Sequence, residues 1–204
     1  MTRVNALPRG LSLIELLVTL SIAVVLLTVG VPSFVDMIAA NTAVSYANDL
    51  LADLNYARNE AITRGFNVVV CKGIATAVGS GCTSGNWDGG WKVFVDCNGD
   101  QTISASTCPG NSDEAVLRVH PALSSEWTLR GDSHVPNYIT FKAIGLPNTN
   151  GTLVFCQGGV LHSGNQPRSA AVTVNRTGRA RVLSYNAYGV PLDNQGSALT
   201  SCHT

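Results

Sequence analysis

The chain has 204 residues, and 13 lysines and arginines balance 13 aspartates and glutamates, so the total charge indicates neither a polyanionic partner nor an acidic substrate. Apolar residues make up 45% of the sequence and the 20 glycines follow no three-residue repeat, which excludes a disordered chain and a collagen-like one. Six cysteines are many for a cytosolic protein of this size and indicate an oxidising compartment.

The N-terminal part holds an apolar segment from Leu11 to Val31, in which Glu15 is the one ionisable residue. About 21 residues are long enough as a helix to cross a bilayer core of roughly 30 Å. Arg3 and Arg9 precede the segment and predict that its start stays in the cytoplasm while the rest lies outside. All six cysteines follow the segment, which agrees with this orientation. Taken alone, the segment is typical of an ordinary single-span anchor.

A motif at the start of the segment narrows this interpretation. Residues 10–18, Gly-Leu-Ser-Leu-Ile-Glu-Leu-Leu-Val, resemble the processing site of type IV prepilins. The resemblance implies that a prepilin peptidase cuts after Gly10, that the new amino terminus at Leu11 is methylated, and that the apolar helix is kept. The sequence departs from the usual pattern in having Leu11 in place of phenylalanine and Ser12 in place of threonine.

Glu15 is an unusual residue for an apolar span, since a carboxylate there costs about 2.5–3.5 kcal/mol on insertion scales. The resemblance implies a role in assembly, in which Glu15 meets the amino terminus of a neighbouring subunit in a filament. Helix capping is the alternative, because Ser12 and Glu15 have the spacing of a capping box. The two roles can coexist.

The helical pattern continues beyond the span. Pro32 lacks an amide donor and is expected to kink or locally open the helix. An amphipathic part then ends at Arg64, because Gly65 is a natural stop. Its apolar residues recur at spacings of three and four: Val44, Ala47, Leu50, Leu51, Leu54, Ala57, Ala61 and Ile62. We therefore expect a leader at 1–10, a transmembrane helix at 11–33 and an amphipathic continuation at 34–64.

After Gly65 the pattern changes to short β-rich runs separated by turn residues. The expected strands are Phe66–Lys72, Trp91–Asp96, Ala115–His120, Trp127–Arg130, Tyr138–Ala143, Thr152–Cys156, Ser169–Asn175 and Arg179–Tyr185. Their number predicts antiparallel hairpins or two small sheets that bury one face against the helix. The expected fold class is α+β, with a long N-terminal membrane-spanning and amphipathic helix packed on an antiparallel β-rich head at 65–204. This is the lollipop plan of type IV pilins.

Several motifs of the head resemble the FimT/GspH family. They are Trp87-x-x-Gly90-Trp91-x-Val93-Phe94-x-Asp96-x-Asn98-Gly99-Asp100, Val116–Arg118, Ile139–Phe141 with Gly145 soon after, Phe155–Cys156, and Thr177–Val182. The family contains minor pilins of type IV pili and a tip-proximal pseudopilin of type II secretion. The resemblance implies a single-pass protein of the bacterial inner membrane with a periplasmic head. Such a subunit joins other pilins in a filament and reaches the pilus or cell surface.

The cysteines allow many pairings. Short closures favour Cys71 with Cys82 and Cys97 with Cys108, which leaves Cys156 with Cys202. Zinc is the alternative, but the sequence has neither a C-x-x-C pair nor paired histidines with ligand spacing.

Other chemical sites are not indicated. Asp96, Asn98 and Asp100 begin like a calcium loop, but Gln101 replaces the required glycine and Thr107 the required glutamate, so an Asx-rich turn is favoured. The sequence has no nucleophile elbow, phosphate loop or paired-carboxylate motif. We expect no enzyme, no metal and no cofactor.

Local charge is uneven although the total is zero. Between Asp49 and Glu114 there are eight acidic and four basic residues, whereas from Lys142 onward there are five basic residues and one acidic residue, Asp193. This pattern indicates a basic patch for an anionic partner. Arg179 and Arg181 are two apart on an expected strand and should project from one face, with Arg176 across the turn that Gly178 permits.

Guanidinium groups can fork onto phosphate oxygens without reading bases. In FimT-type minor pilins of naturally transformable bacteria a matching Gly-Arg-x-Arg motif binds DNA for uptake. The resemblance therefore implies DNA binding without sequence preference, and the implied residues are Arg176, Gly178, Arg179 and Arg181, with Lys142 and Arg168 as an extension. The alternative is a structural minor pilin or pseudopilin, with arginines that face neighbouring subunits. Such a protein would prime filament assembly for pilus motility and adhesion or for type II secretion.

The processing motif gives a first testable prediction. In cells with prepilin peptidase, the membrane-extracted protein should start at Leu11 and carry one additional methyl group. Intact-mass and N-terminal peptide mass spectrometry measure both features. A chain that keeps Met1 in such cells would contradict the pilin interpretation.

Overall fold

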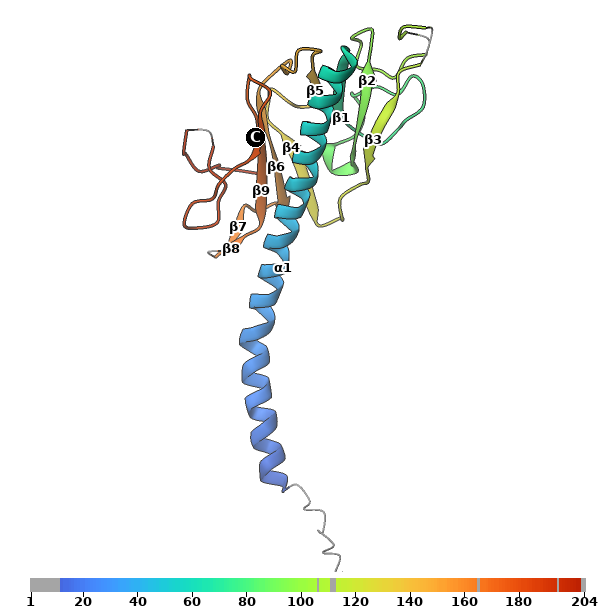
Figure 1. Ribbon diagram of the computed structural model, residues 1–204. Coiled ribbons are helices and arrows are strands. Elements are labelled where there is room, and N and C mark those ends of the chain that lie inside the picture. Colours follow the sequence, from blue (N-terminus) through green and yellow to red (C-terminus); the bar gives the residue numbers. More distant parts are fainter. Residues whose placement is uncertain (1–11, 106, 111–112, 165, 194, 203–204) are drawn as a thin grey trace, which may run out of the picture.

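The computed structural model describes residues 12–105, 107–110, 113–164, 166–193 and 195–202 (Figure 1). Its longest element is α1, Leu13–Arg64, which projects from a β-rich head like a stalk. The Oγ atom of Ser12 accepts a hydrogen bond from the Glu15 amide at 3.2 Å, so Ser12 is the N-cap of the helix. The leader, with the expected cleavage site at Gly10 and Leu11, lies outside the described residues.

The helix is continuous through Pro32, so the local opening expected at this residue is wrong. Figure 1 shows a gentle curve of α1 and no break. A proline removes one intrahelical hydrogen bond. Opening the backbone further would expose more polar groups in a segment that is otherwise apolar, which favours a continuous helix. The helix ends at Gly65, whose φ of 73° is in the left-handed region.

The head consists of two four-stranded antiparallel sheets and a small hairpin, so the second of the two expected arrangements, two small sheets, is the one present. The first sheet has the order β3-β2-β1-β5, with β1 (Asn67–Lys72), β2 (Trp91–Asp96), β3 (Val116–His120) and β5 (Tyr138–Phe141). The second has the order β10-β9-β6-β4, with β4 (Trp127–Gly131), β6 (Gly151–Gln157), β9 (Ser169–Val174) and β10 (Ala180–Val182). The hairpin pairs β7 (His162–Ser163) with β8 (Gln166–Pro167), and a short 3-10 helix, η1 (Trp87–Gly89), precedes β2.

A stripe of alanines and leucines on α1 packs against both sheets. The buried residues of the stripe are Ala39, Ala43, Ala47, Leu50, Leu54, Ala57 and Ala61. They follow steps of three and four, as expected for one helix face. Val44 and Ile62 were expected in this stripe but are exposed. The contact face is centred on the alanines, because their small side chains allow the strands to approach the helix closely.

One carboxylate on this face is held by the first sheet. Asp53 is 7% exposed and accepts hydrogen bonds from the indole nitrogen of Trp91 at 2.8 Å and from Arg118 at 2.9 Å. The Trp91 ring stacks on His120 with centroids 3.7 Å apart, and the Arg118 guanidinium lies 3.9 Å from the ring centre of Tyr56. These contacts fix β2 and β3 to the helix, and they satisfy a buried charge that would otherwise be costly.

Three disulfides close within the head: Cys71–Cys82, Cys97–Cys108 and Cys156–Cys202. This is the pairing that short closures favoured. The third disulfide fixes the C-terminal part of the chain to β6. Each such bridge typically contributes about 2–4 kcal/mol to the free energy of unfolding.

The disulfides give a second prediction. Full-length protein made in an oxidising compartment should show no maleimide-reactive thiol after denaturation without reductant, and six after reduction. Reduction should also lower the melting temperature, by about 2–4 °C for each kcal/mol lost in a chain of this size. Reactive thiols in the unreduced protein would contradict the oxidising-compartment argument.

Candidate functional site

Two arginines of the second sheet share a hollow on the surface. Thr173, Asn175, Arg179 and Arg181 line a cavity of about 360 Å³, which we call the arginine hollow. Arg181 of β10 lies opposite Thr173 of β9, and Arg179 lies just before β10, since this strand is shorter than expected. Both arginine side chains are exposed. The lining residues combine two positive charges with neutral polar groups, an arrangement that suits an anion.

The turn that carries the hollow is held by Asn175. Its Oδ1 atom accepts hydrogen bonds from the Arg179 amide at 2.9 Å and the Thr177 amide at 3.1 Å. The backbone closes the turn as well, with the Gly178 amide donating to the Asn175 carbonyl at 2.9 Å. Side chains with local backbone partners preorganise a turn. The turn therefore has a fixed shape that does not depend on a ligand.

Gly178 supports the turn by allowing close packing. It is buried, with a φ of 81°, and a Cβ atom there would lie 2.3 Å from the Gly145 carbonyl oxygen. Arg58 of α1 stabilises the same turn, because it donates hydrogen bonds to the carbonyls of Gly145 at 3.0 Å and Thr177 at 3.2 Å. The role of Gly178 at this surface is therefore positional, since its atoms are covered by the 142–149 loop and by the helix.

The other basic residues expected here differ in position. Arg176 is exposed on the turn, and its Nε donates to Asn150 Oδ1 at 3.3 Å. Lys142 is exposed at the start of the 142–149 loop that packs against this turn. Both residues thus lie at the same end of the second sheet as Arg179.

Arg168 does not lie on this surface. It precedes the first residue of β9, whereas Arg181 pairs with Thr173 near the last, so most of a six-residue strand separates them. At about 3.3 Å per residue this is more than 10 Å. Its guanidinium forms an ion pair with Asp36 of α1 and donates to Gln157 Oε1 at 3.0 Å. The expectation that Arg168 extends the basic patch is therefore wrong.

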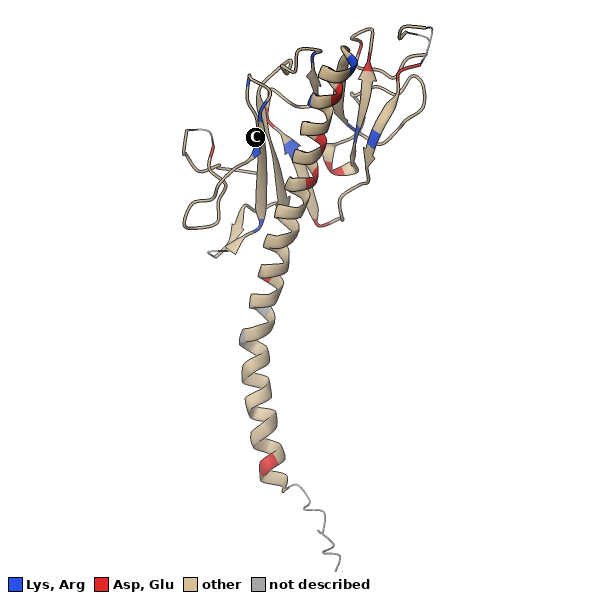
Figure 2. Cartoon of the chain, in the orientation of Figure 1, with Lys and Arg blue, Asp and Glu red and all other residues tan. Residues whose placement is uncertain are grey.

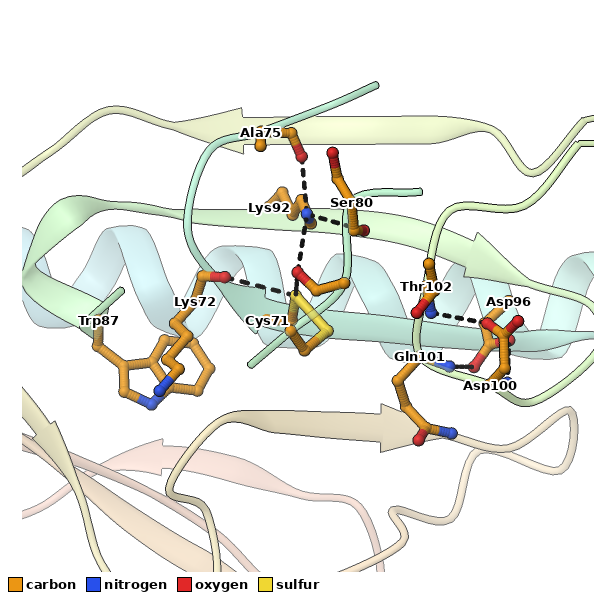
Figure 3. Close-up of a disulfide and its surroundings, with 12 residues drawn as sticks. Cys71, Lys72, Ala75, Ser80, Trp87, Lys92, Asp96, Asp100, Gln101 and Thr102 are labelled. Atoms are coloured by element: carbon orange, nitrogen blue, oxygen red, sulfur yellow. Dashed lines mark hydrogen bonds between the residues drawn. A yellow bond between two sulfur atoms is a disulfide. The ribbon is translucent and has the colours of Figure 1, made fainter. Parts of the chain in front are cut away.

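A buried lysine of the first sheet, Lys92, stabilises the neighbouring loop that contains residues 75–81. Lys92 of β2 donates to the carbonyls of Ala75 at 2.7 Å and of Ser80 and Gly81 at 3.3 Å each, beside the Cys71–Cys82 disulfide (Figure 3). Burial lowers the pKa of Lys92. The three carbonyls compensate for removing the ammonium from water.

The acidic turn after β2 is organised by its own backbone. Asp96 Oδ1 accepts the Gly99 amide at 2.7 Å, and Glu114 Oε1 accepts the Cys97 amide at 2.7 Å. Burial raises the pKa of Asp96. Figure 3 shows Asp96 and Asp100 directed at the 100–102 backbone, which agrees with the Asx-rich turn expected from the sequence.

Sequence reasoning missed Arg58 and Asn175 as supports of the arginine hollow. Arg58 contacts residues 87 and 119 positions later in the chain, so no local pattern could have indicated its partners. Asn175 could have been found, because asparagine before a Thr-Gly turn often bonds to the backbone two residues on.

Comparisons with known proteins found a matching family model and similar solved structures. Residues 46–178 match the model of a family described as type II transport protein GspH. The type IV minor pilin FimU of Pseudomonas aeruginosa has a similar solved structure, with a TM-score of 0.50, 22% identity, and coverage of 79% of this chain and 96% of that one. For the minor pseudopilin EpsH of the type 2 secretion system of Vibrio cholerae the TM-score is 0.41, with 15% identity and coverage of 70% and 96%. No curated protein matches the sequence significantly.

The packing at Gly178 gives a third prediction. Gly178→Ala should lower the free energy of unfolding by roughly 3 kcal/mol, because it adds overpacking to left-handed strain. Gly196→Ala is the matched control, since Gly196 has a φ of 83° and nothing within 4 Å of its Cβ position. This control should cost only the strain, about 1 kcal/mol. Equal losses in thermal unfolding of the two variants would contradict the close contact between the turn and the 142–149 loop.

Proposed function

We infer from its membership of the GspH family that this chain is a minor pilin or pseudopilin of a type IV pilus or a type II secretion system. We propose that it is a minor pilin that binds DNA for uptake in natural transformation. The observation that carries the proposal is the arginine hollow, where Arg179 and Arg181 are exposed side by side. The turn beneath them is fixed by Asn175 and Arg58 before any ligand arrives.

The hollow suits the phosphate backbone of DNA. Two guanidiniums provide several N–H donors and match phosphate oxygens in geometry and charge. Arg176 and Lys142, exposed at the same end of the second sheet, extend the positive surface to a neighbouring phosphate. Phosphate contacts of this kind carry no base information, so the binding has no sequence preference.

The anchor completes the proposal. The described part of the chain contains one helix, α1, that is long and apolar enough to cross a membrane, by length and composition. In this proposal prepilin peptidase cleaves after Gly10, Leu11 is methylated, and the head faces the periplasm until the subunit enters a pilus. The head then carries the arginine hollow to the cell surface.

Assembly without DNA binding is the second candidate function, and Glu15 favours it. This residue is exposed on an apolar stretch of α1, in the first turn of the helix. A carboxylate in such a place calls for a partner in the filament, such as the amino terminus of a neighbouring subunit. In this function the subunit primes filament assembly, and the arginines face other subunits.

The DNA proposal gives a fourth prediction. If Arg179 and Arg181 each neutralise about one phosphate, Arg179→Ala with Arg181→Ala should reduce the salt slope of duplex binding by about 1.8. For the parent, these two contacts alone should weaken binding about 12-fold between 50 and 200 mM salt. Fluorescence anisotropy of the full chain in non-ionic detergent, on two unrelated duplexes, measures both values.

The matched control is Arg64→Ala, which removes one exposed arginine from a different hollow, beside Phe66 and Val95. It should leave the slope nearly unchanged, whereas Arg181→Ala alone should reduce it by about 0.9. A double variant that binds like the parent, or a parent that does not bind near physiological salt, would leave assembly as the function.

A further inference from the structure

The end of the head nearest to the lower part of α1 forms a distinct surface, which we call the underside. It comprises the 157–161 loop, the β7–β8 hairpin with Arg168, and the 186–190 turn (Figure 1). The turn lies against β8, because a Cβ atom on Gly189 would be 2.7 Å from the Pro167 nitrogen. Arg168 ties this surface to the helix through its ion pair with Asp36.

The helix has no polar spacer between its apolar span and the underside. Phe34 and Ile38 are 63% and 62% exposed, and Val35 and Met37 between them are exposed as well. Asp36 is the one charged residue between Glu15 and Asp49, and it is paired with Arg168. Figure 2 shows this part of α1 almost free of charged residues. Such an apolar surface is unfavourable in water, so the membrane should reach up to the head.

The length of the helix places the underside at headgroup depth. Asp36 lies 23 residues after Leu13, which is about 35 Å along the axis at 1.5 Å per residue. The hydrocarbon core is about 30 Å thick, and the whole bilayer with headgroups about 40–45 Å. When Leu13 lies at one edge of the core, Asp36 and the attached Arg168 therefore lie among the headgroups of the opposite leaflet.

The underside carries a row of polar side chains with opposite charges at its ends. Gln157 Nε2 donates to Glu126 Oε2 at 3.1 Å, and Gln157 Oε1 accepts from Arg168 at 3.0 Å. These three residues, with His162 and Ser163, line a hollow of about 470 Å³. One end of the row thus offers donors to an anion, and the other end offers a carboxylate to a cation.

Around this hollow the underside exposes side chains typical of a membrane interface. Tyr188 of the adjoining turn is 63% exposed, and Val160 at the rim is 45% exposed. Tyrosine is enriched at headgroup level because its ring is apolar and its hydroxyl is polar. An arginine beside such residues can keep its charge at the polar layer.

We propose that the underside docks on the membrane surface before assembly and that its hollow takes a zwitterionic phospholipid headgroup. The phosphate lies at Arg168, and a primary ammonium, as in phosphatidylethanolamine, lies at Glu126. The proposal rests on the membrane anchorage of α1 and is independent of DNA binding. It gives Arg168 a role at the opposite end of the second sheet from the arginine hollow.

Depth measurements on the full chain in nanodiscs of phosphatidylethanolamine and phosphatidylglycerol test the docking. The described native cysteines are all paired, so a single added cysteine takes a spin label specifically. For each label we take the ratio of its accessibility to dioxygen over its accessibility to a water-soluble nickel chelate. This ratio should be several-fold higher for a label at Val160→Cys than for a label at Ile144→Cys. Ile144 is the control, because it is exposed on the 142–149 loop beside the C-terminal end of α1.

Lipid selectivity tests the headgroup. Native mass spectrometry of the full chain released from mixed nanodiscs should show phosphatidylethanolamine retained over phosphatidylcholine, whose quaternary ammonium cannot donate a hydrogen bond to Glu126. Glu126→Gln should lower this preference about 1.4- to fivefold, the range of an exposed charge pair. Glu60→Gln is the matched control, since Glu60 pairs with Arg64 in the last turns of α1, and it should keep the preference.

Each other outcome overturns the proposal in a distinguishable way. A label at residue 160 as water-accessible as the label at 144 removes the docking, and an unchanged lipid ratio in Glu126→Gln removes the headgroup site. If the underside is accessible to water in nanodiscs and becomes protected in filaments, it is a subunit interface and not a membrane-docking surface. A chain that does not enter nanodiscs at all contradicts the membrane anchorage itself, whatever its affinity for DNA.

Discussion

The close approach of two sheets to one helix is the constraint on which the head depends. The alanines of the buried stripe, from Ala39 to Ala61, let strands of both sheets pack against the same rod. Larger residues in place of these alanines would push the strands away from the helix. The same helix is apolar on all sides below the head. Its sequence must therefore change within a few turns from apolar residues on every face, which suit lipid, to apolar residues on the one face that packs on the sheets.

Apolar packing alone does not fix where each sheet lies along the helix. Two charged residues of α1, Asp53 and Arg58, help to fix these positions. Asp53 binds Trp91 and Arg118 of the first sheet, and Arg58, five residues later, binds the 142–149 loop and the turn of the second. Hydrogen bonds to charged groups have strict geometry and are stronger than neutral ones. Each sheet therefore has polar contacts with α1 that fix its position along the helix.

The sequence allowed most of the elements to be predicted, because their signals are local. The strands at Trp91–Asp96 and Ser169–Val174 agree within one residue with the expected ones. The β7–β8 hairpin was missed because its residues include no apolar run and end in Pro167. The pairing of Arg168 with Asp36 was missed for another reason. It joins residues 132 positions apart, and no pattern within one element indicates it.

The brace from Arg58 to the 175–179 turn has a mechanical consequence. A filament subunit is pulled through its helix, while anything held by the head resists at the surface. Because Arg58 bonds directly to the Thr177 carbonyl, tension at the turn passes into α1 without first crossing the strands of the second sheet. The Cys156–Cys202 bridge joins the end of the chain to β6 covalently, so this end cannot peel away under the same load. The turn is thus a short route for force between the outer surface and the stalk.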